Sequence, residues 1–231
     1  MNMQPGRLET SKVQKMNNKP RLLIATTNKG KVKEIKAILR NLDIKLVLPM
    51  DIGLELDVEE DGQTYAENAT KKALAFSQAS GLTSLADDSG LEVGALNGAP
   101  GLHSARYGPP LTLPPFSGKM GGDRGGGTDV DRRAYLLQNL SGKPRPWVAR
   151  FRATVAVASP ERGVKLVEGI CPGEIIPHER GKGGFGYDPI FLLEDLNKTM
   201  AELEMDEKNR LSHRGQALRK AIPILLEFFR T

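Results

Sequence analysis

Two neighbouring carboxylates follow a short apolar segment, and they are well placed to do chemistry. Asp87 and Asp88 come directly after Ser84-Leu85-Ala86, which has the composition of a buried strand. Two carboxylates at the end of a buried strand are costly unless a cation or hydrogen-bond donors meet them. Mg²⁺ commonly binds one or two carboxylates together with substrate phosphates, and a carboxylate beside it could deprotonate water. The pair therefore suggests a magnesium site, with a solvated turn as the alternative.

A second candidate site is the segment Thr26-Thr27-Asn28-Lys29-Gly30-Lys31, between a strand-like and a helix-like pattern. Asn28 stands where a helix N-cap is expected. The free N–H groups at a helix start bind phosphate, and Lys31 adds positive charge. The segment is not a Walker A loop, because Ala25 and Val32 replace the glycine and the Ser or Thr of that pattern. An ordinary capped surface helix is the alternative.

Two later segments could contact a nucleotide. The stretch from Gly181 to Asp188 formally matches G-x-G-x-x-G, but a strand-like pattern follows it, which is wrong for a dinucleotide-binding turn. Its glycines could bring the backbone close to a ligand while Phe185 or Tyr187 stacks on a base. Further on, Lys208 and the stretch Ser212-His213-Arg214-Gly215 place cations and donors near a helix start. A Gly-rich hairpin and a polar helix junction are the respective alternatives.

The elements that must position these residues alternate between strand and helix patterns, which favours an α/β fold. We expect strands at 21–26, 84–86, 151–158, 164–170 and 190–193, and helices after Asn28, from Thr64 to Gly81, and over 199–207 and 212–229. Residues 21–231 are expected to form a single domain. Residues 1–20 are expected to be a flexible basic tail, and the Pro/Gly-rich residues 109–127 a mobile loop.

Composition excludes several classes of protein. No run approaches the roughly 20 apolar residues of a membrane span, and the first 20 residues lack the apolar core of a signal peptide. A single cysteine, Cys171, fits a cytoplasmic location. The histidines are isolated, so no zinc pattern exists. The net charge of +5 suits polyanionic partners, but aromatic residues make up only 5% of the chain, which disfavours a nucleic-acid-binding module.

Taken in order along the chain, these segments resemble the inosine triphosphate pyrophosphatase family, the non-canonical purine NTP pyrophosphatases. The matching segments run from about Leu22 nearly to the C-terminus. They are Thr26 to Lys31, Thr64-Tyr65-Ala66-Glu67-Asn68-Ala69, Ala86-Asp87-Asp88-Ser89-Gly90-Leu91, Gly98 to Gly101 with Ser104-Ala105-Arg106-Tyr107, Gly183 to Phe191, and Glu207-Lys208 with Ser212 to Leu218. Each is weak alone, and the ordered set is specific.

The resemblance implies an elongated mixed β-sheet flanked by helices, with two lobes, an active cleft between them, and a homodimer. It implies Mg²⁺-dependent hydrolysis of ITP, dITP and XTP to the monophosphate and pyrophosphate, by attack of water at the α-phosphorus. A pyrophosphatase for other modified nucleotides is the alternative. Two features depart from the family pattern, namely the extension before Arg21 and the long Pro/Gly-rich segment after Tyr107.

The resemblance also implies roles for particular residues. Asp88 would accept the proton of the attacking water and bind Mg²⁺, with Glu59 as the second metal ligand; the adjacent Glu60 remains an alternative. Ser89 would touch the substrate. The residues implied to hold the triphosphate are Thr26, Thr27, Asn28, Lys29, Gly30 and Lys31. Those implied to contact the nucleotide and complete the base and phosphate pocket are Phe185, Gly186, Tyr187, Asp188, Lys208, His213 and Arg214.

Overall fold

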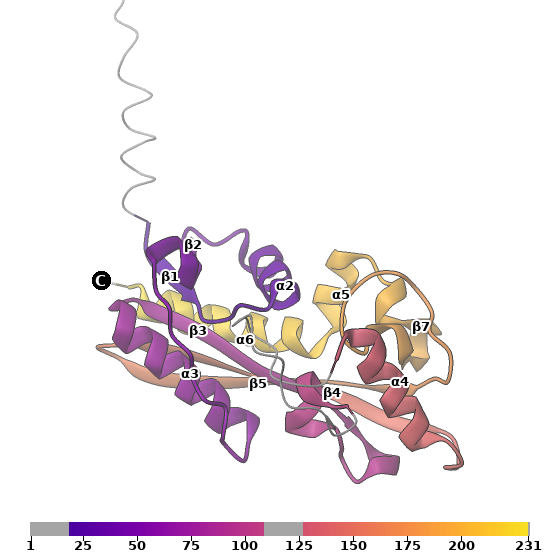
Figure 1. Ribbon diagram of the computed structural model, residues 1–231. Helices are drawn as coiled ribbons and strands as arrows, with labels where there is room; N and C mark the ends of the chain where they lie inside the picture. Colours follow the sequence, from indigo (N-terminus) through magenta and orange to yellow (C-terminus); the bar gives the residue numbers. More distant parts are fainter. Residues whose placement is uncertain (1–18, 109–126, 231) are drawn as a thin grey trace, which may run out of the picture.

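A seven-stranded mixed sheet runs the length of the molecule (Figure 1). The computed structural model describes residues 19–108 and 127–230. The strand order is β2-β1-β3-β4-β5-β6-β7, with β1, β2 and β3 parallel and every later pairing antiparallel. The strands are β1 (Arg21–Ile24), β2 (Lys45–Val47), β3 (Thr83–Val93), β4 (Trp147–Ser159), β5 (Gly163–Ile175), β6 (Phe191–Leu193) and β7 (Lys198–Thr199). The expected α/β fold with a mixed sheet is confirmed.

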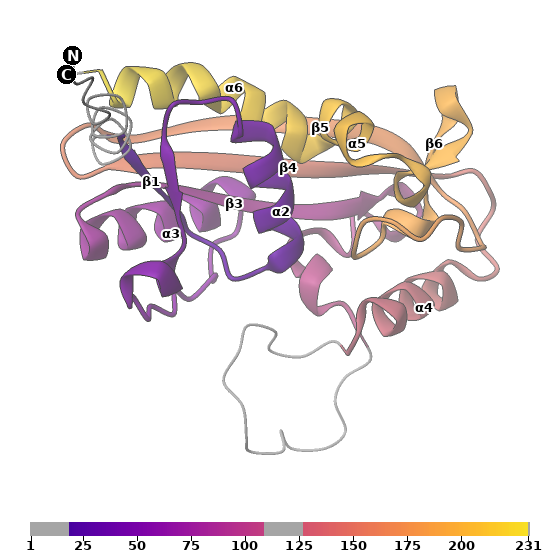
Figure 2. The same cartoon turned by 90° about the horizontal axis from the view of Figure 1, so that it is seen from above.

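Helices cover both faces of the sheet. Helix α3 packs on one face, while α2 and α6 pack together on the other (Figures 1 and 2). The α-helices are α2 (Lys29–Leu39), α3 (Tyr65–Ser80), α4 (Asp129–Leu140), α5 (Met205–Leu211) and α6 (His213–Phe228). Short 3₁₀ helices link the strands: η1 (Pro49–Ile52), η2 (Gly94–Leu96), η3 (Gly101–Arg106), η4 (Asp188–Ile190), η5 (Glu194–Leu196) and η6 (Met200–Glu202).

Successive side chains of β3 enter different cores, because neighbouring residues of a strand point to opposite faces. Ala86 joins the α3-side core. Leu85 joins a core under α2 and α6, whereas Leu91 joins a third core on that same face, beside α4. Asp87 and Ser89 lie between these last two cores. The two cores correspond to the two expected lobes, and the polar residues between them mark where the site must be sought.

Local signals in the sequence fix several helix ends as expected. The side chains of Asn28, Thr64 and Ser212 each accept a hydrogen bond from the backbone of the first turn that follows. Gly81 ends α3 in the left-handed conformation, with φ of 68°. Thr64 and Glu67 have the spacing of a capping box, but only half of the box forms, because Glu67 accepts from the backbone of Gln63 and not from that of Thr64.

Several expected element boundaries are wrong. β1 ends at Ile24 and not at residue 26, β4 begins at Trp147 and not at residue 151, and β5 ends at Ile175 and not at residue 170. The strand expected over 84–86 does not end at Ala86, because β3 continues through Asp87 and Asp88 to Val93, paired with β4 from Ser84 onward. The strand that ends at this point is β1, the other neighbour of β3, which pairs with β3 only as far as Leu85. The helix expected over 199–207 is instead β7, η6 and the start of α5, because Thr199 pairs with β6.

The edges of the expected tail and loop are partly described. Lys19 forms an ion pair with Asp43 at 2.7 Å, and the Pro20 carbonyl accepts from the Lys45 backbone, so these two residues are attached to the sheet edge. Gly127 accepts a hydrogen bond from Arg132 through its carbonyl. The remainder of both predictions, residues 1–18 and 109–126, lies outside the described residues. Within residues 19–108 and 127–230, no helix is long and apolar enough to cross a membrane.

Candidate active site

The chain leaves the sheet at Ala25 and forms an exposed loop before α2. The Ala25 N–H donates to the Leu85 carbonyl at 2.8 Å, the last backbone bond of β1 to β3. Thr26 accepts from the Asn28 backbone at 3.2 Å, and Asn28 accepts from the Lys31 backbone at 3.0 Å. Residues 27–29 are exposed. The positive end of α2 therefore opens beside the middle of β3, as a phosphate site requires.

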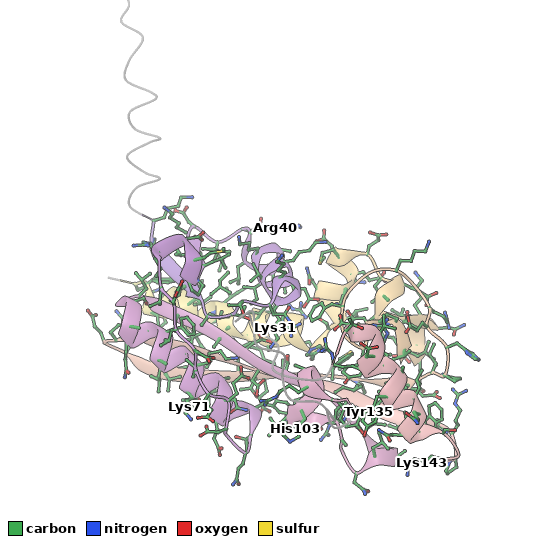
Figure 3. The ribbon with its side chains drawn as sticks, viewed as in Figure 1. Lys31, Arg40, Lys71, His103, Tyr135 and Lys143 are labelled. Atoms are coloured by element: carbon green, nitrogen blue, oxygen red, sulfur yellow. The ribbon has the colours of Figure 1, made fainter. Side chains whose placement is uncertain are left out.

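Lys31 joins this loop to the acidic pair. Its Nζ atom lies 3.2 Å from the Asp87 carboxylate and donates to the Asp87 carbonyl at 3.3 Å. Figure 3 shows Lys31 near the middle of the molecule. A triphosphate at the loop would thus meet a cation already oriented by β3.

Asp87 is held by a buried network of charges on the α2 and α6 face. Arg214 donates from Nε to Asp87 at 2.9 Å, from Nη1 to Glu34 at 2.6 Å, and from Nη2 to Ser89 at 2.8 Å. Burial alone would raise the pKa of Asp87, but the charges of Arg214 and Lys31 outweigh it and hold that pKa far below its ordinary value. Asp87 is therefore ionised and paired with cations. Arg214 uses three of its five N–H donors for hydrogen bonds within the protein.

The same network reaches the later segments through Lys208. Its Nζ atom lies 2.6 Å from Glu34 and 2.5 Å from Asp188. Burial alone would lower the pKa of Lys208, but the carboxylates of Asp188 and Glu34 raise it, so the lysine stays charged. Glu34 is only 2% exposed and was missed in the sequence. Its signal there is weak: one acid, three residues after Lys31, in a helix start full of lysines.

Asp88 points the other way, toward α3. It is 7% exposed, and it accepts from Asn68 at 3.1 Å and from the Ser89 backbone at 3.0 Å. Burial raises the pKa of Asp88, Lys31 opposes that shift, and the negative charge of Glu60 adds to it. No cation pairs with it directly among the contacts of the described residues. A carboxylate with raised proton affinity and few partners is what a general base requires. Asn68, which orients it, also went unassigned in the sequence.

The two candidate metal-binding glutamates differ in their surroundings. Glu60 forms an ion pair with Lys72 at 2.8 Å and lies close enough to Asp88 to raise its pKa. Glu59 is exposed. Within the described ranges no group of three or more His, Cys, Asp or Glu side chains could hold a metal ion. Two mutually repelling carboxylates beside a phosphate loop nevertheless fit Mg²⁺, which takes its other ligands from phosphate and water.

Phe185 lies over the cations of the network. A Cβ atom on Gly30 would come within 2.6 Å of its ring, so the ring rests against the first turn of α2. Lys208 Nζ is 4.9 Å from the ring centroid, and the Arg214 guanidinium carbon is 5.6 Å from it. The Phe185 N–H donates to Asp188 at 2.8 Å. The ring is half-buried, so part of it remains exposed to solvent.

Two of the residues expected to contact the nucleotide have buried side chains. Tyr187 is buried among the α4-side core residues, and its hydroxyl donates to the Ser104 carbonyl at 3.0 Å. His213 stacks on Phe151 with centroids 4.7 Å apart, and burial and the charge of Arg214 lower its pKa well below the ordinary value. The imidazole is therefore neutral at physiological pH and supplies no charge to a phosphate. Both side chains support the walls of the site.

Comparisons with known proteins show which family the chain resembles. The family model described as the Ham1 family matches residues 22–224. A dITP/XTP pyrophosphatase of Desulforamulus reducens is 45% identical over 89% of this chain and 95% of its own, and one of Bacillus licheniformis is 43% identical over 88% and 97%. A solved HAM1 protein from Coxiella burnetii has a TM-score of 0.75 and 36% identity, covering 90% of this chain and 99% of its own.

Proposed function

The chain belongs to the Ham1 family, and from that premise we propose that it hydrolyses non-canonical purine nucleoside triphosphates, namely ITP, dITP and XTP, to the monophosphate and pyrophosphate. The observation that carries the proposal is the meeting of three groups at the middle of β3. These are the exposed start of α2, the Lys31 ammonium paired with Asp87, and the Asp88 carboxylate, which has no direct cation partner among the described residues.

In this proposal Asp88 takes the proton of a water molecule that attacks the α-phosphorus. The water oxygen forms the new bond to phosphorus, the bond to the bridging oxygen breaks, and the electron pair leaves with pyrophosphate. Lys31 and the N–H groups at the start of α2 stabilise the negative charge on that leaving group. Asn68 keeps the Asp88 carboxylate aimed while Arg214 keeps Asp87 out of the reaction.

We propose Mg²⁺ as the cofactor, with Asp88 and either Glu59 or Glu60 as its protein ligands. The position of Glu60 beside Asp88 favours Glu60. When bound, the ion would supply charge to the triphosphate and increase the acidity of water. A structural role for Glu60 through Lys72 would leave the Mg²⁺ requirement of a Glu60 variant unchanged, which makes the assignment testable.

Base selection is proposed to occur beside Phe185. Inosine and xanthosine carry a 6-carbonyl, whereas adenine carries a 6-amino group. A donor facing that edge favours the carbonyl, because an amino group would leave two donors opposed. Guanine shares the 6-carbonyl, so its rejection requires a further group near the 2-position.

The test is a product assay with inosine, xanthosine, adenosine and guanosine triphosphates, with and without Mg²⁺. Monophosphate and pyrophosphate from the inosine and xanthosine substrates alone, lost with a chelator, would support the proposal. Diphosphate and orthophosphate would mean attack at the γ-phosphorus and a different enzyme. No turnover of any of the four would direct attention to modified pyrimidine nucleotides.

A homodimer, a cytoplasmic location and the lack of nucleic-acid binding belong to this proposal as well. They are supported by the family resemblance and by composition rather than by contacts in the structure. Light scattering at several concentrations tests the dimer. A gel shift with single-stranded and double-stranded nucleic acid tests the expected lack of nucleic-acid binding. It is run at low salt, because electrostatic binding is strongest at low salt.

A further inference from the structure

Gly186, the residue after Phe185, is held at both of its backbone polar groups by side chains of α4. Its N–H donates to Asp129 at 2.7 Å, and its carbonyl accepts from Arg133 Nη1 at 2.8 Å. Gly186 has φ of 60°, and Gly184 has φ of 72°, so the segment around Phe185 follows a path that depends on glycine. A segment of this kind has little intrinsic preference for one conformation and needs external contacts to fix it.

The two side chains that make these contacts are themselves fixed. Asp129 accepts from Arg132 through its other carboxylate oxygen. Arg133 is 7% exposed and binds both carboxylate oxygens of Glu179, at 2.8 and 3.0 Å. Bidentate pairing fixes the plane of the guanidinium and leaves Nη1 aimed at the Gly186 carbonyl. Asp129, Arg133 and Glu179 therefore form one assembly, which we call the α4 clamp.

The helix that carries the clamp is firmly placed. Thr128 and Asp131 form a capping box at its start, and Leu136 and Leu140 are fully buried in the core beside β3. In Figure 1, α4 lies at the same end of the sheet as α5 and β7, and Tyr135, labelled in Figure 3, marks its middle. Gly186 is consequently tied to the core of one lobe, while the ring of Phe185 rests on Gly30 of the other.

We propose that Asp129 and Arg133 are positioning residues that hold the Phe185 loop in the conformation that accepts the base. The inference rests on the proposed function, in which Phe185 contacts the base. Neither residue reaches the reacting phosphates in this scheme, so their loss changes how well a nucleotide binds and leaves the proton transfer at Asp88 intact. Burial alone would raise the pKa of Asp129, but the Gly186 N–H and Arg132 lower it, so the clamp stays charged at neutral pH.

The first experiment compares Asp129→Ala with Asp131→Ala. Both remove a carboxylate from the first turn of α4, but only Asp129 touches the loop. We expect Asp129→Ala to raise KM for inosine triphosphate by about 10-fold to 100-fold, the range of a lost hydrogen bond to a charged group, with kcat changed less than about twofold. Asp131→Ala should lower Tm and leave KM unchanged. Asp129→Asn, which keeps one acceptor oxygen, should restore much of the binding.

The second experiment measures the loop without any catalysis. Hydrogen–deuterium exchange of the peptide covering residues 183–188 should be faster in Asp129→Ala and in Arg133→Ala than in the wild type or Asp131→Ala. This readout separates the two proposals. A wild-type chain that hydrolyses none of the triphosphates would sink the proposed function, while the exchange rates would still decide whether the clamp holds the loop.

A third comparison uses Glu179. If Glu179 acts by orienting Arg133, then Glu179→Ala raises KM in the wild-type background and has no further effect in Arg133→Ala. Equal effects in both backgrounds would show that the two residues act separately. A clamp variant with unchanged KM and unchanged exchange, or one whose loss appears in kcat alone, would overturn the inference.

Discussion

Asp87 and Asp88 are adjacent in the chain, but their carboxylates lie on opposite faces of β3 and meet opposite surroundings. Asp87 enters a network of three carboxylates and three cations: Asp87, Glu34 and Asp188 with Lys31, Lys208 and Arg214. Asp88 accepts from the neutral amide of Asn68 and has no cation bound directly to it among the described contacts. The cations of the network lower the pKa of Asp87. Burial raises the pKa of Asp88, and the charge of Glu60 adds to that shift while Lys31 and Lys72 oppose it.

The contrast separates a structural carboxylate from a reactive one. A buried carboxylate that is paired with several cations is stable as an ion and has a low affinity for a substrate proton. A buried carboxylate without a cation partner has a higher affinity for protons and for metal ions. The period of the strand assigns each residue to its face, and the helices packed on that face decide its role. The variants below test this assignment, beginning with the largest expected effect.

Asp88→Asn should reduce kcat by about 10²-fold to 10⁴-fold, the usual contribution of a general base. The thermal midpoint should stay level or rise, because Asn removes a charge that burial and Glu60 disfavour. Steady-state kinetics with inosine triphosphate and a thermal melt on the same sample check both points. Near-normal kcat would show that another group accepts the proton.

Asp87→Asn should have the opposite signature, with a large loss of stability. Removing one partner of a buried ion pair typically costs about 3–5 kcal/mol, because Arg214 and Lys31 lose their compensating charge. Urea unfolding measures the difference. If the two variants destabilised the chain equally, the distinction between the two faces would be wrong.

The same contrast predicts a pH dependence of stability. The folded-state pKa of Asp87 lies below its unfolded value, so its contribution is complete above the unfolded pKa of about 3.9 and is lost as the pH falls toward the folded pKa. The wild type should therefore lose stability below about pH 4. Asp87→Asn should show a shallower loss over that window, as followed by urea unfolding at each pH.

Lys31→Ala should raise KM for the triphosphate by about 10-fold, since it removes the cation between the phosphate loop and β3. Lys33→Ala is the matched control, because Lys33 is exposed on the same helix. Similar KM values for the two variants would mean that general positive charge, and not the placement of Lys31 on Asp87, attracts the substrate.

The last comparison concerns Glu59 and Glu60. Glu60→Gln should raise the Mg²⁺ concentration for half-maximal activity by about 10-fold, or roughly 1.4 kcal/mol. Glu59→Gln should change it less, because Glu59 is exposed. Lys72→Ala removes the ion pair of Glu60 without removing the carboxylate, and serves as control. A larger effect at Glu59 would restore the role that the family resemblance implied.

Much of the fold could be read from local patterns. Asn28, Thr64 and Ser212 cap the expected helices, and Gly81 ends one of them, because capping depends on residues within one turn. The ordered motifs placed the phosphate loop, the acidic pair and the Phe185 segment in one family. The end of β3 was misjudged, because two aspartates are unfavourable in an isolated strand and acceptable only where β4 and Arg214 satisfy them.

The sequence by itself determined the chemical inventory, the strand period and the helix ends, all of which depend on neighbouring residues. Tertiary structure alone decided which groups meet. Glu34 joins Arg214 across 180 positions, Asn68 reaches Asp88 across 20, and Asp129 reaches Gly186 across 57. No local preference records such contacts, because they arise only when separate elements pack on the same face of the sheet. For that reason the two adjacent aspartates look alike in the sequence and differ in the folded protein.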